Sequence, residues 1–147
     1  MRPGAAQLDT LRLTWGVHAA YPEYVSASIG VSTVHTYANG DQRGFFFVAE
    51  PGLNGGRLSI GQTRGFVNGT WSTHLGILHT WNTPPGTLAG VTYFNTEQRL
   101  HVEWFLVGLG IGVRIAGGTS TTSGFALPAP GVQYFIITGV LGVHFTF

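Results

Sequence analysis

Apolar and polar residues alternate along most of this chain with a period of two, which is the pattern of a β-strand rather than of an α-helix. Turn-forming residues such as Gly, Pro, Asn and Asp separate the alternating segments. We place these segments at residues 10–21, 25–32, 45–50, 57–61, 71–81, 89–94, 100–115 and 135–147. The sequence therefore predicts an all-β fold, an eight-stranded antiparallel β-barrel of up-and-down order.

The seventh segment needs one irregularity to keep a single apolar face. Leu100 and Trp104 have even numbers and fall on that face. From Val107 onward the apolar residues have odd numbers, so in a regular strand they would point to the other face. One extra residue in a strand shifts its phase by one, so we expect a β-bulge between Trp104 and Val107. Residues 95–97 are predicted to form the turn before this strand, and residues 117–131 a long loop.

The two faces of the predicted strands differ in a way that separates membrane barrels from soluble ones. One face carries Leu, Val, Ile, Trp and Phe, and the other carries mainly Gly, Ser, Thr and His. Charged residues make up only 9% of the 147 residues, against roughly 25% in an average soluble domain. Strands in lipid must close into a barrel, with apolar side chains outward and polar ones inward. The pattern therefore predicts a transmembrane barrel.

Five charged side chains and four histidines share the predicted inward face. The interior of an eight-stranded barrel is only just wide enough for side chains, and an unpaired buried charge is costly. We therefore expect structural ion pairs that fill the barrel, although a proton path or an acid/base pair is an alternative. The expected interior charges are Arg12, Glu50, Arg57, Glu103 and Arg114, and the expected interior histidines are His18, His74, His101 and His144.

Aromatic residues fall near the expected strand ends, where girdles of such residues meet the membrane surface. With both ends of the chain on the periplasmic side, Tyr21, Tyr24 and Trp81 are predicted at the outer rim. Trp71 and Tyr93 are predicted at the inner rim.

The last strand has an apolar residue at every second position, at Val143, Phe145 and Phe147. This pattern resembles the terminal-strand signature of bacterial outer-membrane barrels, and the length and strand count resemble the small barrels of the OmpA transmembrane-domain type. The resemblance implies a bacterial outer-membrane location, lipid around the barrel and contact with the barrel-assembly machinery. Residues 1–7 are expected to be a flexible segment of this single domain, 1–147, with an export signal already removed.

Composition narrows the function without fixing it. The net charge is +1 and there is no basic run, so nucleic acid is not an expected partner. There is no cysteine, and we expect no metal and no cofactor. A structural or surface-display role is favoured over a small channel or a lipid-modifying enzyme, for which the expected His-x-Ser pair is absent. A soluble lipocalin-like or assembling barrel is a further alternative, and it predicts an apolar interior. The oligomeric state stays open.

Overall fold

A computed structural model of the protein describes residues 10–38, 40–82, 90–117, 119–122, 125–128 and 134–146. The predicted flexible segment at residues 1–7 and the predicted signature residue Phe147 lie outside the described residues.

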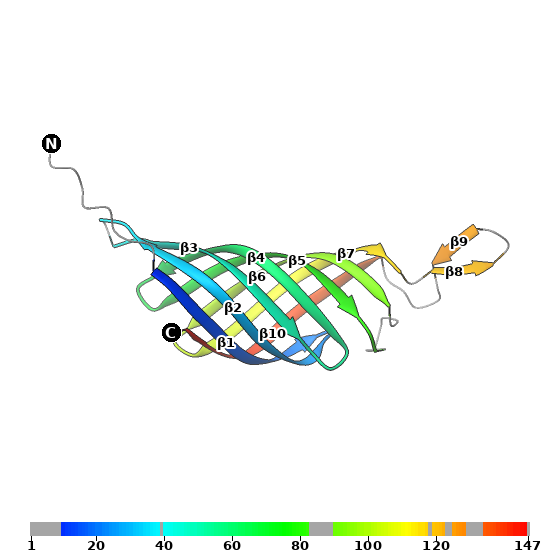
Figure 1. The fold of residues 1–147 in the computed structure, drawn as a ribbon, viewed down its shortest axis with the longest axis horizontal. Helices are drawn as coiled ribbons and strands as arrows, with labels where there is room; N and C mark the ends of the chain where they lie inside the picture. Colours follow the sequence, from blue (N-terminus) through cyan, green and yellow to red (C-terminus); the bar gives the residue numbers. More distant parts are fainter. Residues whose placement is uncertain are drawn as a thin grey trace.

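Eight long antiparallel strands close into a barrel (Figure 1). Around the barrel the order is β1-β10-β7-β6-β5-β4-β3-β2, so each strand pairs with the barrel strands before and after it in the chain, and β1 pairs with β10. Closure leaves no free strand edge. The predicted all-β, eight-stranded antiparallel fold is confirmed. The strands are β1 (Thr10–Tyr21), β2 (Tyr24–Thr36), β3 (Gln42–Pro51), β4 (Gly55–Phe66), β5 (Gly69–Thr80), β6 (Val91–Val102), β7 (Phe105–Ala116) and β10 (Phe135–Thr146).

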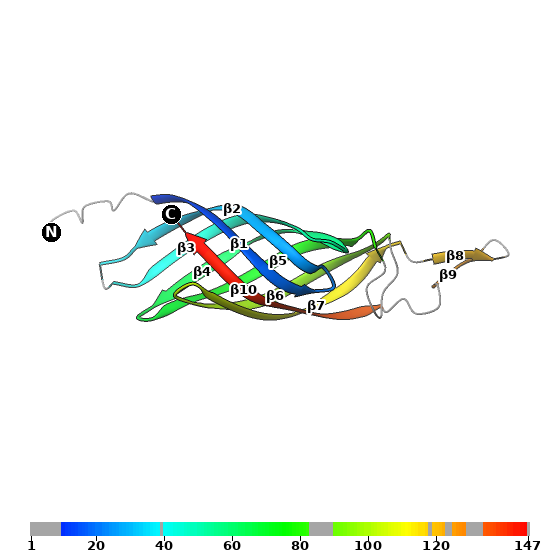
Figure 2. The same cartoon turned by 90° about the horizontal axis from the view of Figure 1, so that it is seen from below.

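The two ends of the barrel differ. β1 begins and β10 ends at one end, which we call the terminal end, together with the β2–β3, β4–β5 and β6–β7 turns (Figures 1 and 2). We call the opposite end the distal end. A small hairpin, β8 (Thr119–Thr122) and β9 (Phe125–Pro128), extends beyond the distal end. It lies within the predicted loop at residues 117–131.

The boundary between the sixth and seventh strands differs from the prediction. Asn95 lies in the middle of β6, opposite Gly76 on β5 and Gly112 on β7, so residues 95–97 are not a turn. The predicted β-bulge is also wrong, because the chain reverses at Glu103 and Trp104 between β6 and β7. Glu103 has a φ of 54° there. Neither turn residue is Gly, Asn or Asp, so ordinary turn chemistry does not mark this reversal.

The outward face of the barrel is apolar and the inward face is mainly polar. Exposed apolar side chains occur on every barrel strand, among them Leu13, Ile29, Phe47, Ile60, Leu75, Phe94, Leu109 and Ile137. Buried polar side chains lie on the other face, among them Thr14, Ser28, Ser59, Ser72, Asn95 and Thr138. This is the reverse of a soluble barrel, whose interior is apolar. Among the described residues, no helix is long and apolar enough to cross a membrane.

Some apolar side chains are also buried inside the barrel, and four of them form a cluster. Leu78, Val91, Tyr93 and Ile136 are buried together, and Tyr21 packs against them. These residues lie near the distal ends of their strands. Tyr93 was expected at the inner rim on the outward face, but its side chain is 0% exposed and belongs to this cluster. The rim differs because β6 begins at the distal end and Tyr93 is close to its start. The face differs because Val91, Tyr93 and Asn95 occupy the buried alternate positions of β6.

Candidate functional site in the barrel interior

The interior contains an ion pair that crosses the barrel. Glu50 on β3 accepts two hydrogen bonds from Arg99 on β6, with both N···O distances 2.7 Å. Two strands, β4 and β5, separate these residues around the wall. A bidentate guanidinium–carboxylate pair is among the stronger polar contacts in proteins. The pair therefore braces opposite parts of the barrel.

The Glu97 carboxylate accepts three further hydrogen bonds beside this pair. Its Oε2 accepts a hydrogen bond from Arg57 Nη1 on β4 at 2.6 Å and one from Thr138 Oγ1 on β10 at 2.9 Å. Its Oε1 accepts a hydrogen bond from Arg99 Nε. Glu97 lies on β6, so its carboxylate connects three strands through buried groups.

Glu23 completes the cluster from the β1–β2 turn. Its side chain is buried, and its Oε1 accepts a hydrogen bond from Arg57 Nε at 2.9 Å. Burial raises the pKa of the Glu23 carboxyl, and the Arg57 charge opposes that rise. We call Glu23, Glu50, Arg57, Glu97 and Arg99 the interior charge network. Its three carboxylates face two guanidinium groups.

The predicted interior charges divide into two groups. Glu50 and Arg57 belong to the interior charge network. Arg12 points inward but lies toward the terminal end, outside the network. Arg114 lies near the distal end, where its guanidinium carbon is 4.2 Å from the centre of the Tyr134 ring. Glu103 does not lie on the inward face of a strand, where it was expected: it is exposed in the β6–β7 turn, at the mouth of the interior cavity described below.

Sequence reasoning missed Glu23, Glu97 and Arg99. Glu97 was predicted to lie in a turn. Because the next strand was then predicted to begin at residue 100, Arg99 was not assigned to an inward face either. If residues 91–102 are taken as one strand, Glu97, Arg99 and His101 share one face, because side chains alternate across a strand. Glu23 carries no such signal, since a turn residue does not follow strand alternation.

The four predicted interior histidines lie on the inward face. His18 and His74 are buried, and His101 and His144 are partly buried. His18 Nδ1 is 3.5 Å from Glu50 Oε1. The rings of His101 and His144 meet edge to face, with centroids 4.8 Å apart. His18 and His74 therefore adjoin the interior charge network, whereas His101 and His144 lie toward the terminal ends of β6 and β10.

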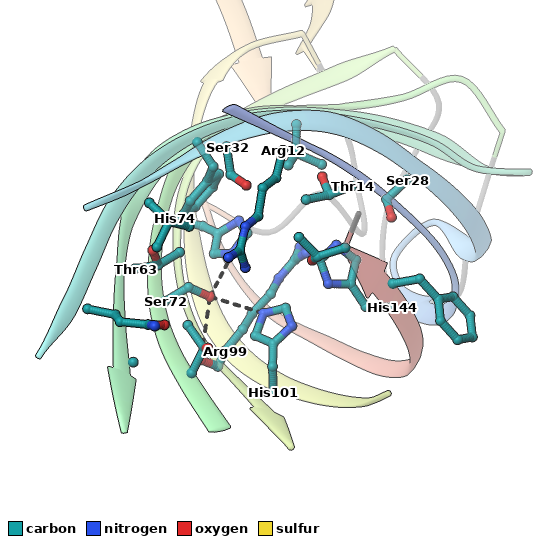
Figure 3. A pocket seen from close by; sticks show the side chains of 18 of the residues that line it. Arg12, Thr14, Ser28, Ser32, Thr63, Ser72, His74, Arg99, His101 and His144 are labelled. Atoms are coloured by element: carbon teal, nitrogen blue, oxygen red, sulfur yellow. Dashed lines mark hydrogen bonds between the residues drawn. The ribbon is translucent and has the colours of Figure 1, made fainter. Parts of the chain in front are cut away.

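A cavity of about 520 Å³ occupies the terminal half of the interior (Figure 3). His74, His101 and His144 line it, and Arg99 contributes to its inner wall. The expectation that side chains fill the whole barrel is therefore too strong. The distal half holds the interior charge network and the apolar cluster, and the terminal half holds an open cavity.

Ser72 is the candidate nucleophile in this cavity. Its Oγ lies 3.1 Å from His74 Nε2 and 3.3 Å from His101 Nε2. A catalytic triad also needs a group that orients the histidine through its other nitrogen. Within the described part of the chain, His74 Nδ1 has no hydrogen-bond partner. Among the described residues, His74 therefore lacks the orienting partner that such a triad requires. In the same part of the chain, no group of three or more His, Asp or Glu residues could hold a metal ion.

Aromatic side chains mark both ends of the outer wall. Trp71 is exposed near the terminal end and Trp81 near the distal end. Tyr24 is exposed at the distal end, whereas Tyr21 turns partly inward against the apolar cluster. In the last strand, Val143 pairs with Val17, and Phe145 stacks on Trp15 with ring centroids 4.8 Å apart.

Comparison with known proteins gives no match: no family model, no curated protein and no solved structure corresponds to this chain.

Proposed function

We propose that the protein is an integral outer-membrane β-barrel with a structural or surface-display role in the bacterial envelope. The observation that carries the proposal is the reversed placement of apolar and polar side chains in a closed barrel. Ile60 on β4 and Leu109 on β7 point outward and are 59% and 69% exposed, whereas Glu50 and Arg99 are buried inside. Water would penalise such an outer wall, and lipid would not.

The dimensions of the barrel support the same proposal. Its strands are 10 to 13 residues long, close to the roughly 9–11 residues that a tilted strand needs to cross a bilayer. Trp71 and Trp81 lie near opposite ends, and each indole N–H has a polar partner, Gln98 Oε1 and the Leu53 carbonyl respectively. Amphipathic rings at both ends suit the two interfaces of a membrane.

The interior favours a structural role over transport. The interior charge network and the apolar cluster fill the distal half. An ion would have to break buried pairs to pass. The β8–β9 hairpin extends beyond this closed end, where it would be displayed (Figure 1). Lipid is the proposed surrounding and the barrel-assembly machinery the proposed partner, in line with the OmpA-type resemblance of the sequence.

The test is refolding in detergent followed by gel electrophoresis with and without heating. A closed membrane barrel keeps its fold in the unheated sample and migrates at a different position from the boiled one. A protein that is soluble and monodisperse without detergent would contradict the proposal. In planar bilayers the closed distal half predicts no steady conductance, and stepwise channel openings would contradict the structural role.

A further inference from the structure

The cavity in the terminal half is lined by both polar and apolar side chains. Residues from every barrel strand except β7 line it, and its volume is about 520 Å³. Phe46, Val48 and Trp104 contribute apolar surface, and Arg12, Thr14 and Ser28 contribute polar groups from β1 and β2. A volume of this size is within the range of small-molecule sites, roughly 300–1,000 Å³.

Arg12 lines the cavity and forms no ion pair with a described residue. Its half-buried side chain reaches from β1 into the cavity (Figure 3). The other two arginines that line the cavity have carboxylate partners: Arg99 bonds Glu50, and Arg43 bonds Asp41 at 3.2 Å. No ion pair or hydrogen bond joins Arg12 to another described residue. A guanidinium inside a cavity without a carboxylate partner keeps its charge and its donors available, so this position favours a bound anion.

Unpartnered polar atoms lie on the same wall. Thr14 follows Arg12 by two residues on the inward face of β1, and Ser28 lies on the neighbouring strand opposite Gly16. Both side chains are 5% exposed, and neither hydroxyl has a hydrogen-bond partner among the described residues. His74 Nδ1, on a separate wall of the cavity, is also buried without such a partner. Hydroxyls and an imidazole N–H can all donate to an oxyanion.

We propose that this cavity binds a small organic oxyanion, a phosphate or a carboxylate, which enters from the terminal end. Arg12 supplies the charge, and the hydroxyls of Thr14 and Ser28 add donors beside it. The apolar surface of Phe46 and Val48 contacts the body of the ligand. Glu103 lies at the mouth in an exposed turn, where solvent screens its charge. The site is inside the barrel, so it does not depend on what surrounds the outer wall.

The test uses phenyl phosphate as the probe, with the whole chain refolded in a non-ionic detergent and a phosphate-free buffer. Isothermal titration calorimetry should show saturable binding at one site per barrel. Phenol, which has the ring without the charge, should bind far more weakly. No saturable binding of phenyl phosphate, or equal binding of phenol, would overturn the proposal.

Three substitutions test whether the anion binds in the cavity or is attracted to any arginine of the protein. Arg12→Gln should weaken phenyl phosphate binding by about tenfold or more, because it removes a charged donor. Arg64→Gln should leave binding within about twofold, because Arg64 is exposed and does not line the cavity. Thr14→Val keeps the shape of the side chain and should weaken binding less than Arg12→Gln. Equal losses in Arg12→Gln and Arg64→Gln would overturn the proposal. Unchanged gel mobility in unheated samples checks that each variant still folds.

Discussion

Arg99 and Glu50 face each other across the barrel and share two parallel hydrogen bonds of 2.7 Å. The pair joins β6 to β3, which do not touch along the wall. Through Glu97 the same arginine is linked to Arg57 on β4 and Thr138 on β10. The wall is held by backbone hydrogen bonds between neighbours, and the interior charge network adds contacts between strands that are not neighbours.

Breaking this pair from one side should strongly destabilise the barrel. Glu50→Gln leaves the buried Arg99 charge without its bidentate partner, and we expect a loss of about 3–5 kcal/mol in the free energy of unfolding. Arg99→Met should cost at least as much, because it leaves both Glu50 and Glu97 short of a partner. Denaturant unfolding of the refolded protein, followed by circular dichroism, measures both.

The matched control is an arginine whose ion pair is at the surface. Arg43 is exposed and bonds Asp41, so Arg43→Gln should change stability by no more than about 1 kcal/mol. If Glu50→Gln proved as mild as Arg43→Gln, the interior charge network would not be a structural brace.

Substituting Glu103, which follows the last residue of β6, should not destabilise the barrel. Glu103 is exposed, and its φ of 54° is a conformation that costs an ordinary residue energy and glycine much less. We expect Glu103→Gly to be neutral or to stabilise the barrel by up to about 1 kcal/mol. Glu97→Gln, six residues earlier, should destabilise it, since that carboxylate holds three partners. A large loss in the Glu103 variant in the same unfolding experiment would mean that its carboxylate has an interior role.

The contrast between these glutamates shows what the sequence could predict. Where alternation continued without interruption, as through Glu50 on β3 and Arg57 on β4, the inward face could be assigned correctly. Around Glu97 and Glu103 the inward face could not be assigned from alternation. Asn95-Thr96 has the composition of a turn but lies within a strand, and Glu103-Trp104 forms a turn without turn composition. A boundary error moves residues to the wrong face or the wrong end of the barrel.

Gly108 tests how closely the interior is packed around Arg99. A Cβ at this position would lie 2.7 Å from Arg99 Cγ and 2.8 Å from Val140 Cγ1. Gly108→Val should displace the Arg99 side chain and cost about 1–3 kcal/mol or more. Gly139→Ala on the adjacent β10 is the control, because its Cβ would meet nothing closer than 3.7 Å. Equal stability of the two variants in thermal unfolding would contradict the packing described for Arg99.

Gly108 leaves room for the Arg99 side chain on the inward face. The cavity could not be predicted from alternation. Its volume depends on which side chains meet across the barrel, and that follows from the register of all eight strands rather than from the pattern of any one. The interior position of Glu23 could not be predicted either, because Glu23 lies in a turn and strand alternation does not apply to it.

The most direct test of the proposed membrane location is one charge placed at the middle of the outer wall. Ile60 is 59% exposed and pairs with Phe47 and Leu75 in mid-strand. In phospholipid vesicles, Ile60→Arg should lower the free energy of unfolding by about 2–4 kcal/mol, because the guanidinium would lie in hydrocarbon. Val67→Arg is the control: Val67 is 98% exposed in the β4–β5 turn, and the substitution should cost no more than about 1 kcal/mol. If Ile60→Arg is as stable as Val67→Arg and both stay soluble without lipid or detergent, the outer wall faces water and the account is wrong.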